Sequence, residues 1–143
     1  SCGANPTPIA FAEVYLALQN GTVDSQENPL PTIEAKKFYE VQKNISLTGH
    51  IVDSLLTVMS GSLWGKLTPE EKKIFTEVAL EAAARSSDKI KKREAELVDD
   101  FKKKGLGVHT VNRQSFVDAV LKAKSVESMG FDRKDYDRIT AIK

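Results

Sequence analysis

A long helix is the feature of this 143-residue sequence that most limits how the chain can fold. Thr68 stands before Pro69 and two glutamates, an order that predicts an N-cap, a proline in the first turn and a capping box. Helix-favouring residues continue until Gly105, the expected stop. At about 1.5 Å per residue, the span 68–104 would be about 55 Å long. Such a helix would extend beyond one small domain.

The rest of the sequence predicts shorter helices separated by turn residues. Apolar residues at helical spacing indicate a helix over residues 9–20 and another over 32–43, with Thr32 available as the cap of the second. The same spacing returns over residues 113–127, and a last short helix is expected within 131–142.

Three short segments have the composition of β-strands. Residues 45–51, 55–59 and 108–111 are rich in β-branched or apolar residues and are short enough to be strands. We expect the first two to belong to a buried sheet. Because strands alternate with helices, the pattern favours an α/β layered architecture. Parallel and antiparallel pairing both remain open at this point.

The charge and hydropathy of the chain exclude several classes of protein. Lysine and arginine total 21, and aspartate and glutamate total 20, so the net charge of +1 gives no field that would attract nucleic acid. No stretch approaches the roughly 20 apolar residues that cross a bilayer. We expect a folded, water-soluble protein with no nucleic-acid partner.

No arrangement of residues indicates catalysis, a metal site or a cofactor. His50 and His109 are the only histidines, and neither has a second histidine or a cysteine at a metal-ligand spacing. The glycines form no phosphate-binding loop, and the run 60–62 is not a nucleophile elbow. We therefore expect no enzyme, and a structural or surface role for each histidine.

Three features allow both a structural and a functional interpretation. Phe11 and Tyr15 lie one turn apart on the first predicted helix, a spacing more typical of core residues than of ligand contacts. Asn28, in the turn-forming run 26–31, either directs its amide at a ligand or closes an Asx turn, and the local sequence supports both equally. The dense alternating charges of residues 89–104 favour a solvated helix surface over a docking face.

Several motifs, in a fixed order, resemble one transporter family. They read GANPTPIAF over residues 3–11, EVY over 13–15, ALQ over 17–19, VDSQENP over 23–29, FYEVQK over 38–43, LTGH over 47–50 and LTPE over 67–70. Together with the long helix, they resemble the extracytoplasmic solute-binding proteins of tripartite ATP-independent periplasmic (TRAP) transporters. The resemblance runs from Gly3 to the C-terminus.

This resemblance implies a binding function and a two-lobed fold. Members capture a small organic acid, a carboxylate, between two α/β lobes in the periplasm and deliver it to TRAP membrane subunits, without a cofactor. The implied elements are periplasmic-binding-protein-like. Residues 1–44 would belong to the second lobe, 45–67 to the crossover and first-lobe strands, 68–104 to a helix spanning both lobes, and 105–143 to the return to the second lobe.

The resemblance also implies four site residues. Phe11 matches an aromatic residue in the ligand cleft, and Asn28 matches an asparagine that contacts the substrate. Asp53 and Leu55 are further candidates, because the segment after His50 enters the cleft in relatives. Ser25 departs from the glycine usual in the family, which would alter the loop if a positive φ were required there.

Two parts of the family pattern are missing from this sequence. The first lobe is largely absent, and so is an arginine that precedes the GANP segment and pairs with the substrate carboxylate. We therefore expect this chain alone to bind ligand weakly or not at all. Because surfaces that the missing part normally covers would be exposed, we also expect self-association, association with a complementary N-terminal chain, or a rearranged fold. The alternative is a structural or interaction domain that docks a partner through its long amphipathic helix.

Overall fold

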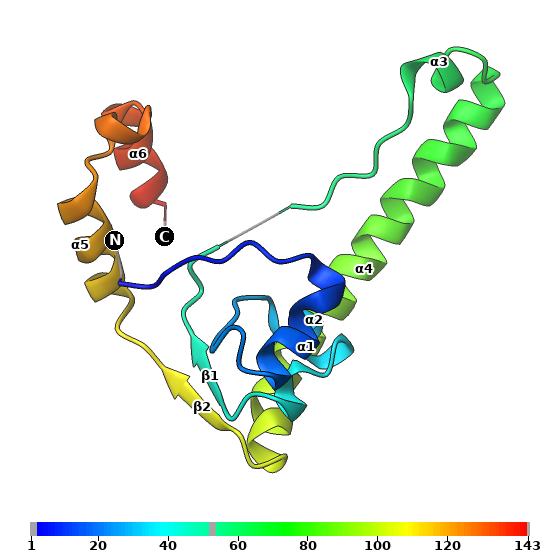
Figure 1. Ribbon diagram of the computed structural model, residues 1–143. Coiled ribbons are helices and arrows are strands. Elements are labelled where there is room, and N and C mark those ends of the chain that lie inside the picture. Colours follow the sequence, from blue (N-terminus) through cyan, green and yellow to red (C-terminus); the bar gives the residue numbers. More distant parts are fainter. Residues whose placement is uncertain (1–2, 52–53, 143) are drawn as a thin grey trace.

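The computed structural model describes residues 3–51 and 54–142 and mixes helices with two short strands (Figure 1). The helices are α1 (Val14–Gln19), α2 (Leu30–Ala35), α3 (Gly61–Trp64), α4 (Pro69–Lys103), α5 (Arg113–Ala123) and α6 (Arg133–Thr140), with 3-10 turns η1 (Phe11–Glu13), η2 (Phe38–Glu40) and η3 (Glu127–Met129). The strands are β1 (Asn44–Leu47) and β2 (Gly107–Thr110). This architecture confirms the expected α/β class.

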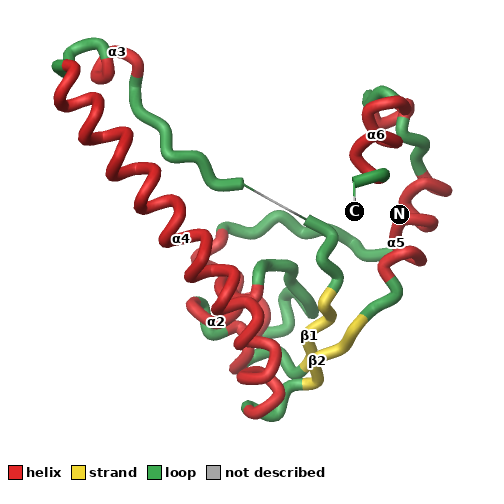
Figure 2. The backbone as a smooth tube through the Cα atoms, turned by 180° about the vertical axis from the view of Figure 1, so that it is seen from behind, coloured by secondary structure: helices red, strands yellow, loops and turns green. Residues whose placement is uncertain are grey.

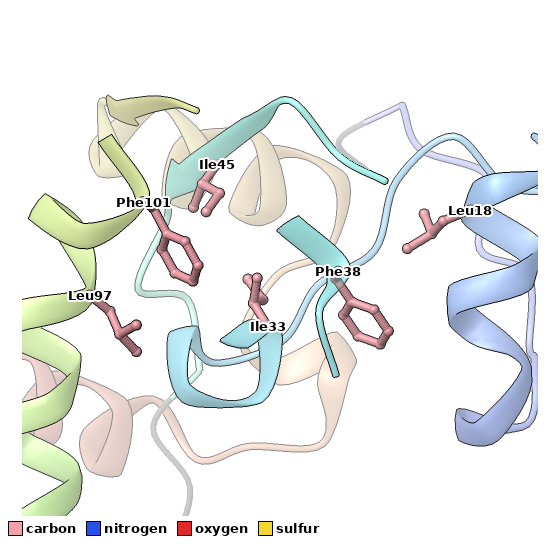
Figure 3. Close-up of a cluster of buried hydrophobic side chains, with 6 residues drawn as sticks. All are labelled: Leu18, Ile33, Phe38, Ile45, Leu97 and Phe101. Atoms are coloured by element: carbon pink, nitrogen blue, oxygen red, sulfur yellow. The ribbon is translucent and has the colours of Figure 1, made fainter. Parts of the chain in front are cut away.

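A small hydrophobic core joins the N-terminal elements, β1 and the C-terminal end of α4. Figure 3 shows its buried side chains, which are Leu18, Ile33, Phe38, Ile45, Leu97 and Phe101. The half-buried Tyr39 packs against it, with its ring centroid 5.8 Å from that of Phe101. Burying each large apolar side chain stabilises the fold by roughly 1.5 to 3 kcal/mol, so this cluster is the main force ordering the region.

The two strands pair in parallel, which answers the question that the sequence left open. Asn44 lies opposite Gly107, and the crossover between the strands runs through α3 and α4. The side-chain oxygen of Asn44 is 3.0 Å from Nε2 of His109. A Cβ on Gly107 would lie 2.5 Å from that oxygen, so glycine makes room for the contact. His109 thus has a structural role at the sheet, as expected.

The long helix α4 is confirmed, and its start has the predicted capping box. The hydroxyl of Thr68 accepts from the backbone N–H of Glu71 at 3.2 Å, and the Glu71 carboxylate accepts from the backbone N–H of Thr68 at 2.8 Å. Its 35 residues span about 52 Å. Within α4, Leu97 and Phe101 are the buried residues, near the end where α2 and β2 pack. The N-terminal half therefore projects away from the core (Figures 1 and 2).

The single helix expected over residues 32–43 is wrong. α2 already begins at Leu30, so Thr32 lies inside the helix instead of capping it. Lys37 then adopts a left-handed conformation with φ of 56°, which separates α2 from η2. In one continuous helix, Ile33 and Phe38 would point about 140° apart. The break lets both side chains enter the core.

The strand expected over residues 55–59 is also wrong. Residues 54–60 form a segment outside the sheet, and the strand expected over 45–51 ends at Leu47. Leu55, Leu56 and Val58 are exposed by 98%, 80% and 83%. Figures 1 and 2 show this segment running from the region beyond β1 to α3, at the far end of α4. A strand needs a neighbour to pair with, and the described part of the chain places none beside it.

The C-terminal residues form a second arm. Asn112 caps α5, because its side-chain oxygen accepts from the backbone N–H of Ser115 at 3.3 Å. The helix expected over 113–127 is confirmed but ends earlier, at Ala123, and α6 confirms the last short helix. Val126, between α5 and α6, is fully buried. The α3–α4 arm and the α5–α6 arm diverge from the core, so the molecule has an open shape (Figure 1).

Candidate ligand-binding site

An open hollow of about 370 Å³ lies between the N-terminal segment and the loop after α1. The chain reverses between the two walls at Gly21, whose φ of 71° suits glycine, and the N–H of Val23 donates back to the carbonyl of Ala17 at 3.3 Å. The lining residues are Thr7, Pro8, Ile9, Phe11, Val14, Val23, Ser25, Gln26, Glu27 and Asn28. Half of these residues are apolar and half are polar, and sites for small molecules combine apolar walls with polar groups that orient the ligand.

Phe11 reaches the hollow from η1. Its ring packs edge-on against the buried Phe38, with centroids 6.3 Å apart and planes at 81°. The residue remains 48% exposed, so the core role that helical spacing favoured is not the observed one. Phe11 is anchored to the core on one side and is open to the hollow on the other. Tyr15 is half-buried, and its hydroxyl donates to Glu40 at 3.0 Å, which raises the pKa of the phenol.

Asn28 reaches the hollow from the opposite wall. Its Nδ2 donates to the side-chain oxygen of Gln26 at 2.6 Å, so the two amides hold each other in place. Ser25 needs no positive φ, because among the described non-glycine residues only Lys37 adopts one. The departure from glycine at Ser25 therefore leaves this loop unstrained. Sequence reasoning did not single out Gln26, although it lies only two positions before Asn28 in the same motif.

A contact between Glu27 and His50 joins this loop to the chain that leaves β1. Nε2 of His50 is 3.4 Å from the Glu27 carboxylate, and Nδ1 is 2.6 Å from the Thr48 hydroxyl. Both side chains of the pair are about half exposed or more, so the pair adds little stability by itself. The contact places residues 48–50 beside the loop. No local signal could have revealed this contact, because the partners are 23 positions apart.

The charges around the hollow limit what it can hold. The lining includes one carboxylate, that of Glu27, and no lysine or arginine among its described residues. The ammonium of Lys36 lies 5.2 Å from the ring centroid of Phe11 and brings a cation close to the wall. The amides and Glu27 suit ligand hydroxyl groups, and Phe11 suits carbon atoms. A ligand carboxylate would need a cation from outside the lining.

The structure brings two of the four predicted site residues together. Phe11 and Asn28 line the same hollow, whereas Leu55 lies in the exposed segment and is not in that lining. Asp53 lies outside the described residues. Within residues 3–51 and 54–142, no group of three or more histidine, cysteine, aspartate or glutamate side chains could hold a metal ion. No helix in those ranges is long and apolar enough to cross a membrane.

An α/β chain with a long projecting helix and an open hollow, lined by apolar and polar side chains, has the features of a solute-binding protein. The sequence pattern of one such family, described as bacterial extracellular solute-binding protein, family 7, matches residues 1–127. The chain belongs to this family, which confirms the resemblance to TRAP solute-binding proteins and the expected extracytoplasmic location.

Individual relatives agree with this assignment. The chain is 46% identical over 118 residues to the sialic acid-binding periplasmic protein SiaP of Vibrio cholerae, a match that covers 82% of this chain and 37% of SiaP. It is 37% identical over 119 residues to the 2,3-diketo-L-gulonate-binding periplasmic protein YiaO of Escherichia coli, covering 82% of this chain and 36% of YiaO.

Solved structures of similar proteins share the fold. A TRAP periplasmic solute-binding protein from Polaromonas sp. JS666, bound to D-erythronate, matches 96% of this chain with a TM-score of 0.83 and 39% identity. One from Roseobacter denitrificans, with bound 3-deoxy-D-manno-oct-2-ulosonic acid, matches 99% with a TM-score of 0.82 and 36% identity. The matches cover 46% and 47% of those two chains. This chain therefore spans less than half the length of these relatives.

Proposed function

We propose that this chain supplies one wall of the binding site in a protein that captures a small organic acid for uptake by a TRAP transporter. The observation that carries the proposal is the convergence of Phe11 and Asn28, from two separate segments, on one hollow. The ligands named for SiaP and for the two solved relatives are hydroxylated carboxylates. We propose the same substrate class here, with delivery to TRAP membrane subunits and no covalent turnover.

Each wall residue has a role that follows from its chemistry. The open face of Phe11 packs against the carbon chain of the ligand, and the amides of Asn28 and Gln26 bond to its hydroxyl or carboxylate oxygens. Glu27 accepts from a ligand hydroxyl. We include Asp53 and Leu55 in the proposed site because they follow His50 in the sequence, in the segment proposed to lead into the crossover between the lobes. The division of residues 1–44, 45–67, 68–104 and 105–143 between two lobes is part of the same proposal.

The charge of the lining leads to an expectation about the chain by itself. A carboxylate leaving water needs a charged partner, and the described lining offers only the negative Glu27. Binding by the 143-residue chain alone is therefore expected to be in the millimolar range or weaker, about 4 kcal/mol of binding free energy. The cation and the opposite wall would come from the rest of the family fold.

A chimaeric protein tests this function. The full chain replaces the matching part of the Polaromonas relative, and titration calorimetry follows binding of D-erythronate, L-galactonate and sialic acid. We expect the chimaera to bind at least one acid, and Phe11→Ala and Asn28→Ala each to weaken that binding about tenfold or more. The matched controls Phe131→Ala and Asn20→Ala change exposed residues outside the hollow and should leave the affinity unchanged.

Two results would contradict the proposal. If the Phe11 and Asn28 variants bound as tightly as the unchanged chimaera, the hollow would not be the site. Micromolar binding by the free chain would show that no cation from elsewhere is needed. The alternative of a docking domain has one observation in its favour, which is that the N-terminal half of α4 buries none of its described side chains.

A further inference from the structure

Lys36 places a positive charge at the rim of the hollow. It lies between the family motifs that end at Pro29 and begin at Phe38, and it belongs to neither of them. Its ammonium lies over the ring of Phe11, 5.2 Å from the ring centroid. Phe11 lines the hollow, whereas Lys36 is not among the lining residues. The charge therefore lies beside the Phe11 wall and not inside the hollow.

The backbone of Lys36 is held in place by α2. Lys36 is the C-cap of this helix, and its backbone N–H donates to the carbonyl of Thr32 at 2.9 Å. The helix is fixed in turn by Ile33, which is buried in the core, and by Glu34, which accepts from Arg93. The side chain of Lys36 is exposed, so its flexible stem can turn while the base of the residue stays in position.

Nearby carboxylates do not neutralise the charge of Lys36. Among the described residues, Lys36 forms no ion pair. Glu34 and Glu40 are close to it in the sequence, but each has another basic partner. Glu34 accepts from the guanidinium of Arg93, and Glu40 lies 4.0 Å from the ammonium of Lys37. The ammonium of Lys36 therefore keeps its charge and its N–H donors available for an anion.

We propose that Lys36 selects ligands by their charge. It attracts organic acids to the wall that Phe11 forms, and it favours acids that carry more than one carboxylate. This selection rests on the proposed function and deepens it by naming a residue that discriminates among acids. Lys36 adds to a cation from the rest of the family fold and does not replace it, because its ammonium lies outside the lining.

The physical basis of the selection is that Coulomb attraction grows with the charge of the ligand. A diacid is attracted by Lys36 about twice as strongly as a monoacid at the same distance, and it is repelled more strongly by Glu27 in the lining. Lys36 offsets that repulsion. The Debye length is about 10 Å at 0.1 M salt, so the ammonium still acts on a ligand that lies against Phe11.

The free 143-residue chain allows a first test that needs no bound solute. An anionic and a neutral nitroxide are added in turn, and the relaxation of the Phe11 and Asn28 backbone amides is measured by NMR. We expect Lys36→Gln to lower the anionic-to-neutral ratio of the enhancements about twofold at low salt. The matched control Lys122→Gln removes the same charge on α5, in the other arm, and should leave the ratio unchanged (Figure 1).

The chimaera with the Polaromonas protein allows a second test, on selection itself. Calorimetry compares D-erythronate with meso-tartrate, which has the same carbon chain with its terminal CH2OH oxidised to a second carboxylate. At low salt, we expect Lys36→Gln to weaken D-erythronate binding about threefold and meso-tartrate binding about tenfold. Lys36→Arg keeps the charge and should restore both affinities, and Lys122→Gln should change neither. At about 0.5 M salt the difference between the acids should shrink.

The outcomes separate this selection from the proposed function. An unchanged nitroxide ratio in Lys36→Gln would overturn the role of Lys36, whichever acid the chimaera binds. An equal loss for both acids, a loss that Lys36→Arg does not restore, or rejection of meso-tartrate by the unchanged chimaera would also overturn it, while the proposed function would stand. A chimaera that bound neither acid would contradict the proposed function and the selection together.

Discussion

Arg93 links α4 to α2 through ion pairs. Its guanidinium donates to both carboxylate oxygens of Glu34 on α2, with the Nε contact at 3.0 Å, and to Asp100 at 2.8 Å and Glu96 at 3.2 Å. The bidentate bond from Arg93 lowers the pKa of Glu34 below its usual 4.5, despite partial desolvation. The dense charges of residues 89–104 are therefore not merely a solvated surface, because one of them ties two helices together.

The lowered pKa of Glu34 makes this tie dependent on pH. A carboxyl group with a lower pKa in the folded state stabilises the protein fully above its unfolded pKa, here 4.5, and this contribution disappears as pH falls through the folded value. We expect Glu34→Gln to lower the thermal midpoint by a few degrees at pH 7 and to make no difference at a pH well below the folded pKa. Calorimetric scans across pH would measure both.

Glu81→Gln is the matched control for this prediction, since Glu81 pairs with Arg85 at 3.4 Å on a fully solvated part of α4. It should leave the midpoint nearly unchanged at every pH. If Glu34→Gln still lowered the thermal midpoint at acid pH, the packing of the Glu34 side chain, and not its charge, would account for the stabilising contact between α2 and α4.

At the scale of elements, α4 combines two halves with different environments. Its C-terminal end is held by the core through Leu97 and Phe101, whereas its start is held by the capping box of Thr68 and Glu71. The Glu71 carboxylate accepts from the backbone N–H and hydroxyl of Thr68, which lowers its pKa. Because the first turns pack on nothing in the described core, local interactions decide their stability.

Thr68→Ala should therefore act locally. We expect amide exchange in the first turn of α4 to become about fivefold faster, as loss of an N-cap bond implies, with little change in the global unfolding midpoint. Thr76→Ala is a suitable control, because Thr76 lies within the same helix and its hydroxyl donates only to the carbonyl of Lys72 among the recorded contacts. A global loss of stability in Thr68→Ala would mean that the arm packs on more of the chain than its burial indicates.

At the scale of the whole molecule, one small core holds two diverging arms. The fold therefore depends on few side chains, and a chain of this size has a small free energy of unfolding. Phe101 and Leu97 are the fully buried residues that join α4 to this core, and Phe101 is the larger of the two. The arms themselves contribute exposed surface more than buried contacts.

Phe101→Ala should remove about 3 to 5 kcal/mol, close to the whole stability expected of such a core. Urea denaturation followed by circular dichroism should lose its cooperative transition, or shift it to much lower urea. Phe131→Ala, at a residue exposed by 65%, should change the free energy of unfolding by less than about 0.5 kcal/mol. A similar small effect for Phe101→Ala would show that another cluster holds the fold.

Features that depend on residues close together in the chain could be predicted from the amino-acid sequence. The capping box at Thr68, the long helix, the helices of the C-terminal arm and the family motifs were all predictable, because caps, helical periodicity and motif order are written in consecutive residues. The three-dimensional structure was needed to show the parallel pairing of β1 and β2, the break at Lys37 and the lack of a strand at residues 55–59. It also decided the meeting of Phe11 and Asn28 in one hollow and the contact of Glu27 with His50. These features depend on which distant segments become neighbours, and burial in a shared core selects those neighbours.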